Sequence, residues 1–155
     1  MSSPIAIDRH IVESLYCEAL ALSDQVRAAF TAPPPCSIGA GADARIDEDL
    51  ARVARSCEGL RTTTRMMHAV AWLLNRRAFL SGDLSAIQLQ RYGRLTRLPD
   101  GDRDRVLLLD PALRDLVAAT EGFYARLERL DRDWNEGAPA PRPLAQLYRK
   151  LGSAA

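Results

Sequence analysis

The chain has 155 residues, of which 47% are hydrophobic, enough for one domain with a buried core. Its 21 basic and 20 acidic residues leave a formal net charge of +1, and this near-balance argues against nucleic acid as the main partner. The longest apolar-leaning run, residues 66–74, is far shorter than the roughly 20 residues of a membrane span, and the N-terminus lacks the pattern of a signal peptide, so we expect a cytoplasmic protein without a membrane span.

Hydrophobic residues recur at helical spacing in the first part of the chain. The stripe steps by three and four residues and comprises Val12, Leu15, Ala19, Leu22, Val26 and Ala29, widened by Ile11 and Phe30. The sequence APPPCSIGAGA at 32–42 ends this pattern, because consecutive prolines followed by glycines cannot continue a helix. The sequence therefore predicts a helix over residues 5–30 and then a loop.

A longer helix is predicted over residues 47–79. Acidic side chains at 47–49 suit the positive end of a helix dipole. A hydrophobic stripe then steps strictly by three and four residues, through Leu50, Val53, Cys57, Leu60, Thr64, Met67, Ala71, Leu74 and Ala78. This is an a/d seam of the kind that packs near-parallel helices, so we expect it to face the core, with Cys57 as a small core residue.

The middle of the chain is less regular. Ser85 and Gln88 have the spacing of a capping box, which predicts a short helical segment after the stop at 81–83. In residues 91–112, two apolar runs flank a Pro-Asp-Gly turn. That arrangement would suit a small hairpin, although we favour a packed loop.

The last long helix is predicted over residues 111–136, with Asp110 as its N-cap and Pro111 in its first turn. Its stripe comprises Leu113, Leu116, Thr120, Phe123, Leu127, Leu130 and Trp134. Gly59 and Gly122 lie inside helices, where each costs about 1 kcal/mol relative to alanine, so we expect a neighbouring helix to approach closely at both.

These elements define the predicted fold. We expect an all-α protein, an antiparallel three-helix bundle with a long central helix and short extra helical segments, over residues 1–137. Residues 138–155 form a proline-rich tail with an amphipathic stretch, which we expect to be flexible or to become ordered on a partner.

No pattern in the sequence predicts chemistry. The possible metal ligands lack ligand spacing on a helix; they are His10, His68, Cys17, Cys36 and Cys57. There is no nucleophile elbow and no glycine-rich phosphate loop, so we expect no enzyme, no metal and no cofactor. One alternative stays open, a ligand pocket between helices lined by Thr63, Met66 and His68.

The central helix is apolar on more than one face around residues 66–74. Beside the seam lies a flank formed by Arg61, Arg65, Trp72 and Arg76. A helix that touches two neighbours needs a wide apolar arc, but Trp and Arg are also the residue types enriched at binding hot spots. We therefore take these four residues as protein-interface candidates. We expect Trp72→Ala to change oligomeric mass or partner binding more than stability.

Residues 58–85 read EGLRTTTRMMHAVAWLLNRRAFLSGDLS. They resemble the signature helix of the bacterial regulator of CtrA degradation family, and YARLERLD at 124–131 is similar to that family's last helix. The matching residues of the first segment are Leu60, Arg61, Thr63, Arg65, Met67, Ala71, Trp72, Leu73 and Leu74, followed by Gly82 and Ser85. The resemblance covers about residues 8–136, and its motif contains no catalytic set.

The resemblance implies a three-helix bundle, often dimeric, that acts as an adaptor in regulated proteolysis and helps the ClpXP protease receive cell-cycle substrates. We therefore expect a homodimer whose partners are a protease component, its substrates, or both. The C-terminal GSAA is similar to the tags that this protease recognises. The alternatives are a bundle that binds a small molecule and a structural dimerisation module.

Overall fold

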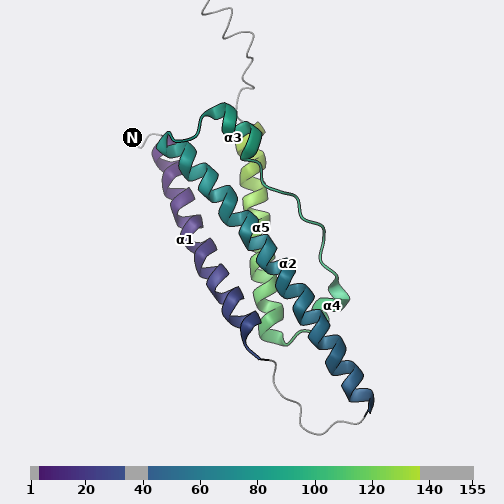
Figure 1. Cartoon of the computed structure of the whole chain (residues 1–155). Coiled ribbons are helices and arrows are strands. Elements are labelled where there is room, and N and C mark those ends of the chain that lie inside the picture. The colour runs from purple at the N-terminus through teal and green to yellow at the C-terminus, as the bar shows by residue number, and fades with distance from the viewer. Residues whose placement is uncertain (1–3, 34–41, 137–155) are drawn as a thin grey trace, which may run out of the picture.

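The computed structural model describes residues 4–33 and 42–136 (Figure 1). Within these ranges the chain forms α1 (Pro4–Thr31), α2 (Ala42–Ser81), α3 (Ala86–Tyr92), α4 (Arg103–Leu107) and α5 (Pro111–Glu136), and no strand. The predicted all-α bundle with a long central helix is confirmed. Residues 34–41 of the predicted loop and the tail at 138–155 lie outside the described residues.

The bounds of the long helices follow the sequence pattern closely. α5 begins and ends where its stripe and caps predict, and α1 extends the predicted helix slightly at both ends. α2 begins at Ala42 instead of Asp47, so it has 40 residues and is about 60 Å long. Its N-terminal end projects beyond the ends of α1 and α5, at the lower right of Figure 1.

α1 runs antiparallel to both other long helices, whereas α5 runs in the same direction as α2 (Figure 1). The predicted antiparallel arrangement therefore holds for α1 but not for α5 relative to α2. The middle of α2 meets the first half of α5, where Arg65 donates to Thr120, and its last part meets the end of α5, where Arg76 pairs with Asp131. Two helices that follow each other can be parallel only if the intervening chain returns along the bundle. Residues 93–102, which we call the strap, make this return.

The strap is an irregular segment bound to both parallel helices. Arg61 of α2 donates to the carbonyl oxygens of Pro99 and Asp100, at 3.0 and 2.7 Å, and the Tyr124 hydroxyl of α5 donates to the carbonyl of Thr96. The hairpin considered for residues 91–112 does not form, since these residues make the strap and the short helix α4. The capping box of α3 is confirmed, with Ser85 and Gln88 each bonding the backbone of the other.

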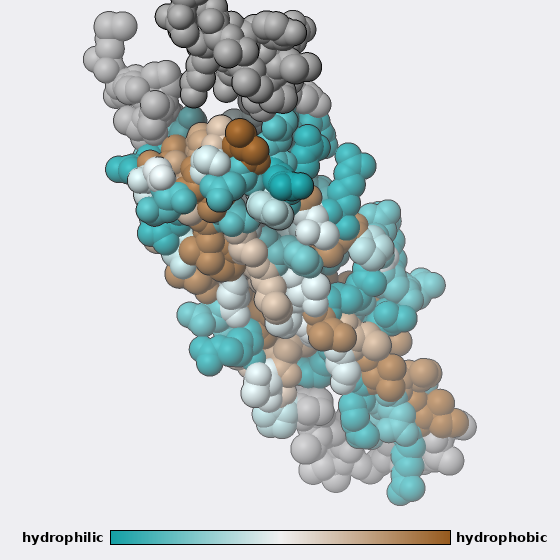
Figure 2. All heavy atoms as spheres, turned by 45° about the horizontal axis from the view of Figure 1, so that its top comes forward, coloured by the Kyte–Doolittle hydropathy of each residue, from teal (hydrophilic) through white to brown (hydrophobic). Residues whose placement is uncertain are grey.

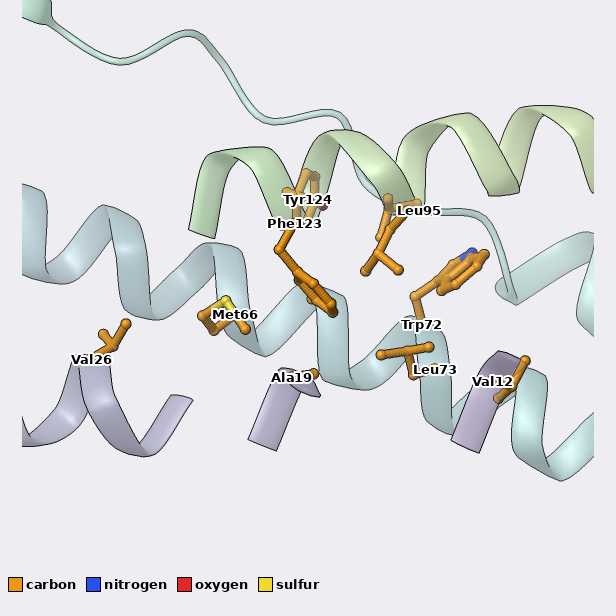
Figure 3. Packing of buried hydrophobic residues seen from close by; sticks show 11 residues of the cluster. Val12, Ala19, Val26, Met66, Trp72, Leu73, Leu95, Phe123 and Tyr124 are labelled. Atoms are coloured by element: carbon orange, nitrogen blue, oxygen red, sulfur yellow. The ribbon is translucent and has the colours of Figure 1, made fainter. Parts of the chain in front are cut away.

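The core lies between the three long helices, as Figure 3 shows from close by. The predicted stripes of α1 and α5 face it: Val12, Ala19 and Val26 are buried, as are Leu113, Thr120, Phe123 and Leu127. α2 contributes a face other than the predicted seam. The residues that it buries are Ala54, Glu58, Gly59, Thr62, Arg65, Met66, Ala69, Trp72, Leu73 and Arg76.

The prediction that the a/d seam of α2 faces the core is therefore wrong. Its large members are exposed, and Cys57 is only partly buried instead of being a core residue. α2 carries two apolar arcs, and hydrophobic spacing alone cannot tell which of them faces inward. The arc that carries Met66, Trp72 and Leu73 offers more bulk to a core, and this is the arc that packs against α1 and α5.

The two helical glycines have different surroundings. A Cβ at Gly59 would lie 2.9 Å from the ring of Phe30 in α1, so the predicted close approach is confirmed there. A Cβ at Gly122 would meet nothing within 4 Å, and the same prediction is wrong for this residue.

Candidate functional site

Three of the four predicted interface residues lie inside the molecule. Trp72 is 2% exposed, Arg65 7% and Arg76 8%, and all three point from α2 toward α5. Arg61 is partly buried under the strap that it binds. The expectation that this flank presents an exposed surface is therefore wrong.

Asp131 of α5 holds the upper part of this flank in place. One of its carboxylate oxygens accepts from the indole nitrogen of Trp72 at 2.8 Å and from Arg76 at 3.0 Å, and the other accepts from the backbone N–H of Leu95. The indole ring of Trp72 stacks on Trp134 with centroids 5.6 Å apart, and the Arg76 guanidinium lies 5.0 Å from both ring centroids. One carboxylate thus ties together α2, α5 and the strap.

Arg65 makes the matching connection lower in the bundle. It donates to the Thr120 hydroxyl at 2.9 Å and to the Glu121 carboxylate at 3.1 Å. Burial lowers the pKa of Arg65 and of Arg76, and the carboxylates of Glu121 and Asp131 oppose that change. Arginine is not deprotonated in proteins, so both side chains remain cationic and their role here is to hold helices together.

Two buried polar residues of α2, Glu58 and Thr62, were not among the residues predicted from the sequence to form a site. Glu58 is fully buried, and the nearest cation among the described residues is Arg61, whose Nε lies 4.0 Å from the carboxylate. Neither its carboxylate nor the Thr62 hydroxyl makes a hydrogen bond within the described part of the chain. A hydrophobic pattern gives no signal for such a pair, since both residues read as polar and therefore as exposed.

The described residues show no arrangement suited to metal chemistry. In residues 4–33 and 42–136 no three His, Cys, Asp or Glu side chains gather where they could hold a metal ion. The three residues suggested as a ligand pocket do not share a surface either. Met66 is buried in the core, whereas Thr63 is exposed and His68 only partly buried.

The exposed face of α2 carries the feature that packing within this chain does not explain. Large apolar side chains recur there at every seventh residue, namely Ile46 (60% exposed), Val53 (59%), Leu60 (71%), Met67 (66%) and Leu74 (44%). Leu50 adds to this row, and smaller residues fill the alternate seam positions: Cys57, Thr64, Ala71 and Ala78. We call these residues the outer seam. Figure 2 shows hydrophobic surface gathered over the projecting N-terminal end of α2, at the lower right.

Two neighbouring parts of the molecule border the outer seam. On one side Arg77 of α2 pairs with Glu13 of α1 at 2.8 Å, and on the other Arg61 and Asn75 bond the backbone of the strap and of Tyr92. Contiguous exposed apolar surface of this length is unusual on a monomer and marks sites of protein or membrane contact. Among the described residues, no helix has the length and apolarity that a bilayer crossing requires.

Fold and surface together define a helical-bundle protein with an exposed coiled-coil-like face. Sequence comparison matches one family model to both the bundle and the tail. The chain belongs to the family described as "Protein of unknown function (DUF1465)", whose model matches residues 5–154. No curated protein and no solved structure matches it.

Proposed function

We propose that the protein is a non-enzymatic, protein-binding adaptor that acts in the cytoplasm as a homodimer and helps deliver substrates for regulated, ClpXP-type proteolysis in cell-cycle control. The outer seam carries this proposal. An a/d row that is 44–71% exposed at its large positions is the surface that a second helix needs, and nothing in the described chain covers it.

The resemblance of residues 58–85 to the regulator of CtrA degradation family supports the choice of pathway. The residues that carry it divide between two faces of α2. Leu60, Met67 and Leu74 belong to the outer seam, whereas Arg65 and Trp72 hold α2 to α5. The motif therefore describes both the interior of the bundle and the face that it presents.

A reconstituted degradation assay tests the adaptor role. Purified ClpXP should degrade a regulated cell-cycle substrate faster when the full chain is present, and the immobilised chain should retain a protease component or such a substrate from a native lysate. Leu60→Glu should abolish the acceleration, whereas Leu20→Glu, at a 42% exposed apolar site on α1, should preserve it. Unchanged degradation together with no retained component would contradict the proposal.

A structural dimerisation module is the second candidate, because the same outer seam favours it. Self-association in the absence of any effect on proteolysis would select this function over the adaptor role.

A further inference from the structure

We propose that the outer seam of α2 is filled by the same seam of a second copy, running antiparallel and centred near Leu60 and Thr64. This inference rests on the proposed role of the seam as a protein-binding surface and adds its occupant and register. The first support is the spacing of the seam. A two-fold axis placed beside residue 62 brings each seam position of one copy opposite a seam position of the other. In that register every large residue of the row faces a seam residue of the second copy.

Side-chain sizes match in this register. Antiparallel coiled coils pack each a position against a d position of the partner. The resulting layers join Thr64 with Leu60, Cys57 with Met67, Ala71 with Val53, Ala78 with Ile46, and Leu50 with Leu74. All but the last pair a small side chain with a large one, so these four layers each avoid both a void between two small residues and a clash between two large ones.

A parallel arrangement would lose this match. It would stack identical residues, so that layers of two small side chains, such as Ala71 on Ala71, would alternate with layers of two large ones, such as Met67 on Met67. The layers of small residues would leave voids, and the side chains around each void would lose van der Waals contacts.

Charge favours the antiparallel arrangement as well. The N-terminal end of α2 carries Asp47, Glu48 and Asp49, whereas near its other end Arg77 is 38% exposed beside Glu13. Arg76 is buried against Asp131 and takes no part in this comparison. In the antiparallel register, Asp49 of one copy lies on the same flank and at about the same level as Arg77 of the other. Two parallel copies would instead bring their acidic ends together.

Sedimentation of the full chain over a concentration series tests the pairing. We expect twice the mass of the chain, and an increase in the dimer dissociation constant of about 100-fold or more for Leu60→Glu, because the pairing would bury two new charges in an apolar layer. Leu60 is 71% exposed within one copy, so the variant should keep the helical content and the core. Leu20→Glu is the matched control and should keep the mass of the dimer.

Disulfide trapping tests the direction. In a background with Cys17→Ser and Cys36→Ser, Met67→Cys should form a bond to Cys57 of the other copy on mild oxidation, identified by peptide mapping. Adding Cys57→Ser should abolish the cross-link. A bond between two copies of Cys57, or between two cysteines at position 67, would show parallel pairing and overturn the inference.

A monomeric full chain would also overturn the inference, and would assign the seam to another protein or to residues 137–155. These outcomes are separate from the adaptor test. A monomer that still accelerates degradation contradicts the pairing and the homodimer but keeps the adaptor role, whereas a cross-linked antiparallel dimer without effect on proteolysis contradicts only the adaptor role.

Discussion

The indole nitrogen of Trp72 donates to a carboxylate oxygen of Asp131 at 2.8 Å, and this bond joins two parallel helices that the chain connects through α3, the strap and α4. The same oxygen accepts from Arg76, whose guanidinium lies against both tryptophan rings. The carboxylate is 14% exposed and the guanidinium side chain 9%, so solvent screens this ion pair poorly. The attraction between the two charges is therefore stronger than in a surface salt bridge of the same length.

Asp131→Asn tests this connection. Asparagine can still accept from Trp72, but it leaves the buried Arg76 cation without its counter-charge, so we expect a loss of about 3 kcal/mol in the free energy of unfolding. Urea denaturation followed by circular dichroism measures it. The double variant Asp131→Asn/Arg76→Met removes the stranded charge and should recover most of the loss. A single variant as stable as the parent chain would show that the ion pair contributes nothing.

Trp72→Ala should act on stability and not on assembly, which corrects the expectation from sequence. Trp72 is 2% exposed and lies between α2 and α5, so its truncation should cost about 3–5 kcal/mol. Met67→Ala on the same helix is the matched control. Met67 is 66% exposed within one copy, so its truncation should change the stability of the monomeric fold by less than about 0.5 kcal/mol.

The sequence predicted the helices well and the orientation of the central one poorly. The stripes of α1 and α5 are the only broad apolar faces on those helices, so each could be assigned to the core without ambiguity. α2 has two faces of similar hydrophobicity, and the regular heptad of the outer seam is the stronger signal because it contains no charge. The buried face is interrupted by Glu58, Arg65 and Arg76, which enter the core through partners that no local pattern reveals.

The direction of α5 was hidden for a related reason. Short connections make successive helices antiparallel, and the composition of residues 91–112 does not distinguish a hairpin or a packed loop from a return crossing. The hydrogen bonds that fix the strap join it to Arg61 and Tyr124, which are far away in sequence. Such contacts follow from the fold and not from the segment itself.

The two helical glycines offer a matched pair of substitutions with opposite expected signs. Gly122→Ala gains helix propensity in open space and should raise the free energy of unfolding by about 1 kcal/mol. Gly59→Ala gains the same propensity, but its Cβ would lie 2.9 Å from Cδ1 and 3.2 Å from Cγ of Phe30, so the Phe30 ring or the helix that carries it must shift. We expect a net loss of about 1–2 kcal/mol there. Thermal denaturation of both variants checks the pair, and equal shifts in the same direction would contradict the close approach of α1.

Tyr124 should make stability depend on pH in the alkaline range. Burial raises the pKa of its hydroxyl to about 12, from an ordinary value of 10, and the hydroxyl donates to the carbonyl of Thr96. Between these two values the unfolded chain has released the proton and the folded chain has kept it, so the folded state binds more protons and its stability falls as pH rises. The slope should be about 1.4 kcal/mol per pH unit over that interval, and the contribution is intact below pH 10.

Tyr124→Phe provides the comparison that isolates this group. The variant should lose about 1 kcal/mol at neutral pH with the hydrogen bond to Thr96, and its stability should fall less steeply than that of the parent chain between pH 10 and 12. Urea denaturation at a series of pH values measures both curves, and the other tyrosines cancel in their difference. Parallel curves for the two proteins would mean that the Tyr124 hydroxyl ionises as readily in the folded chain as in the unfolded one, and that the strap leaves it open to water.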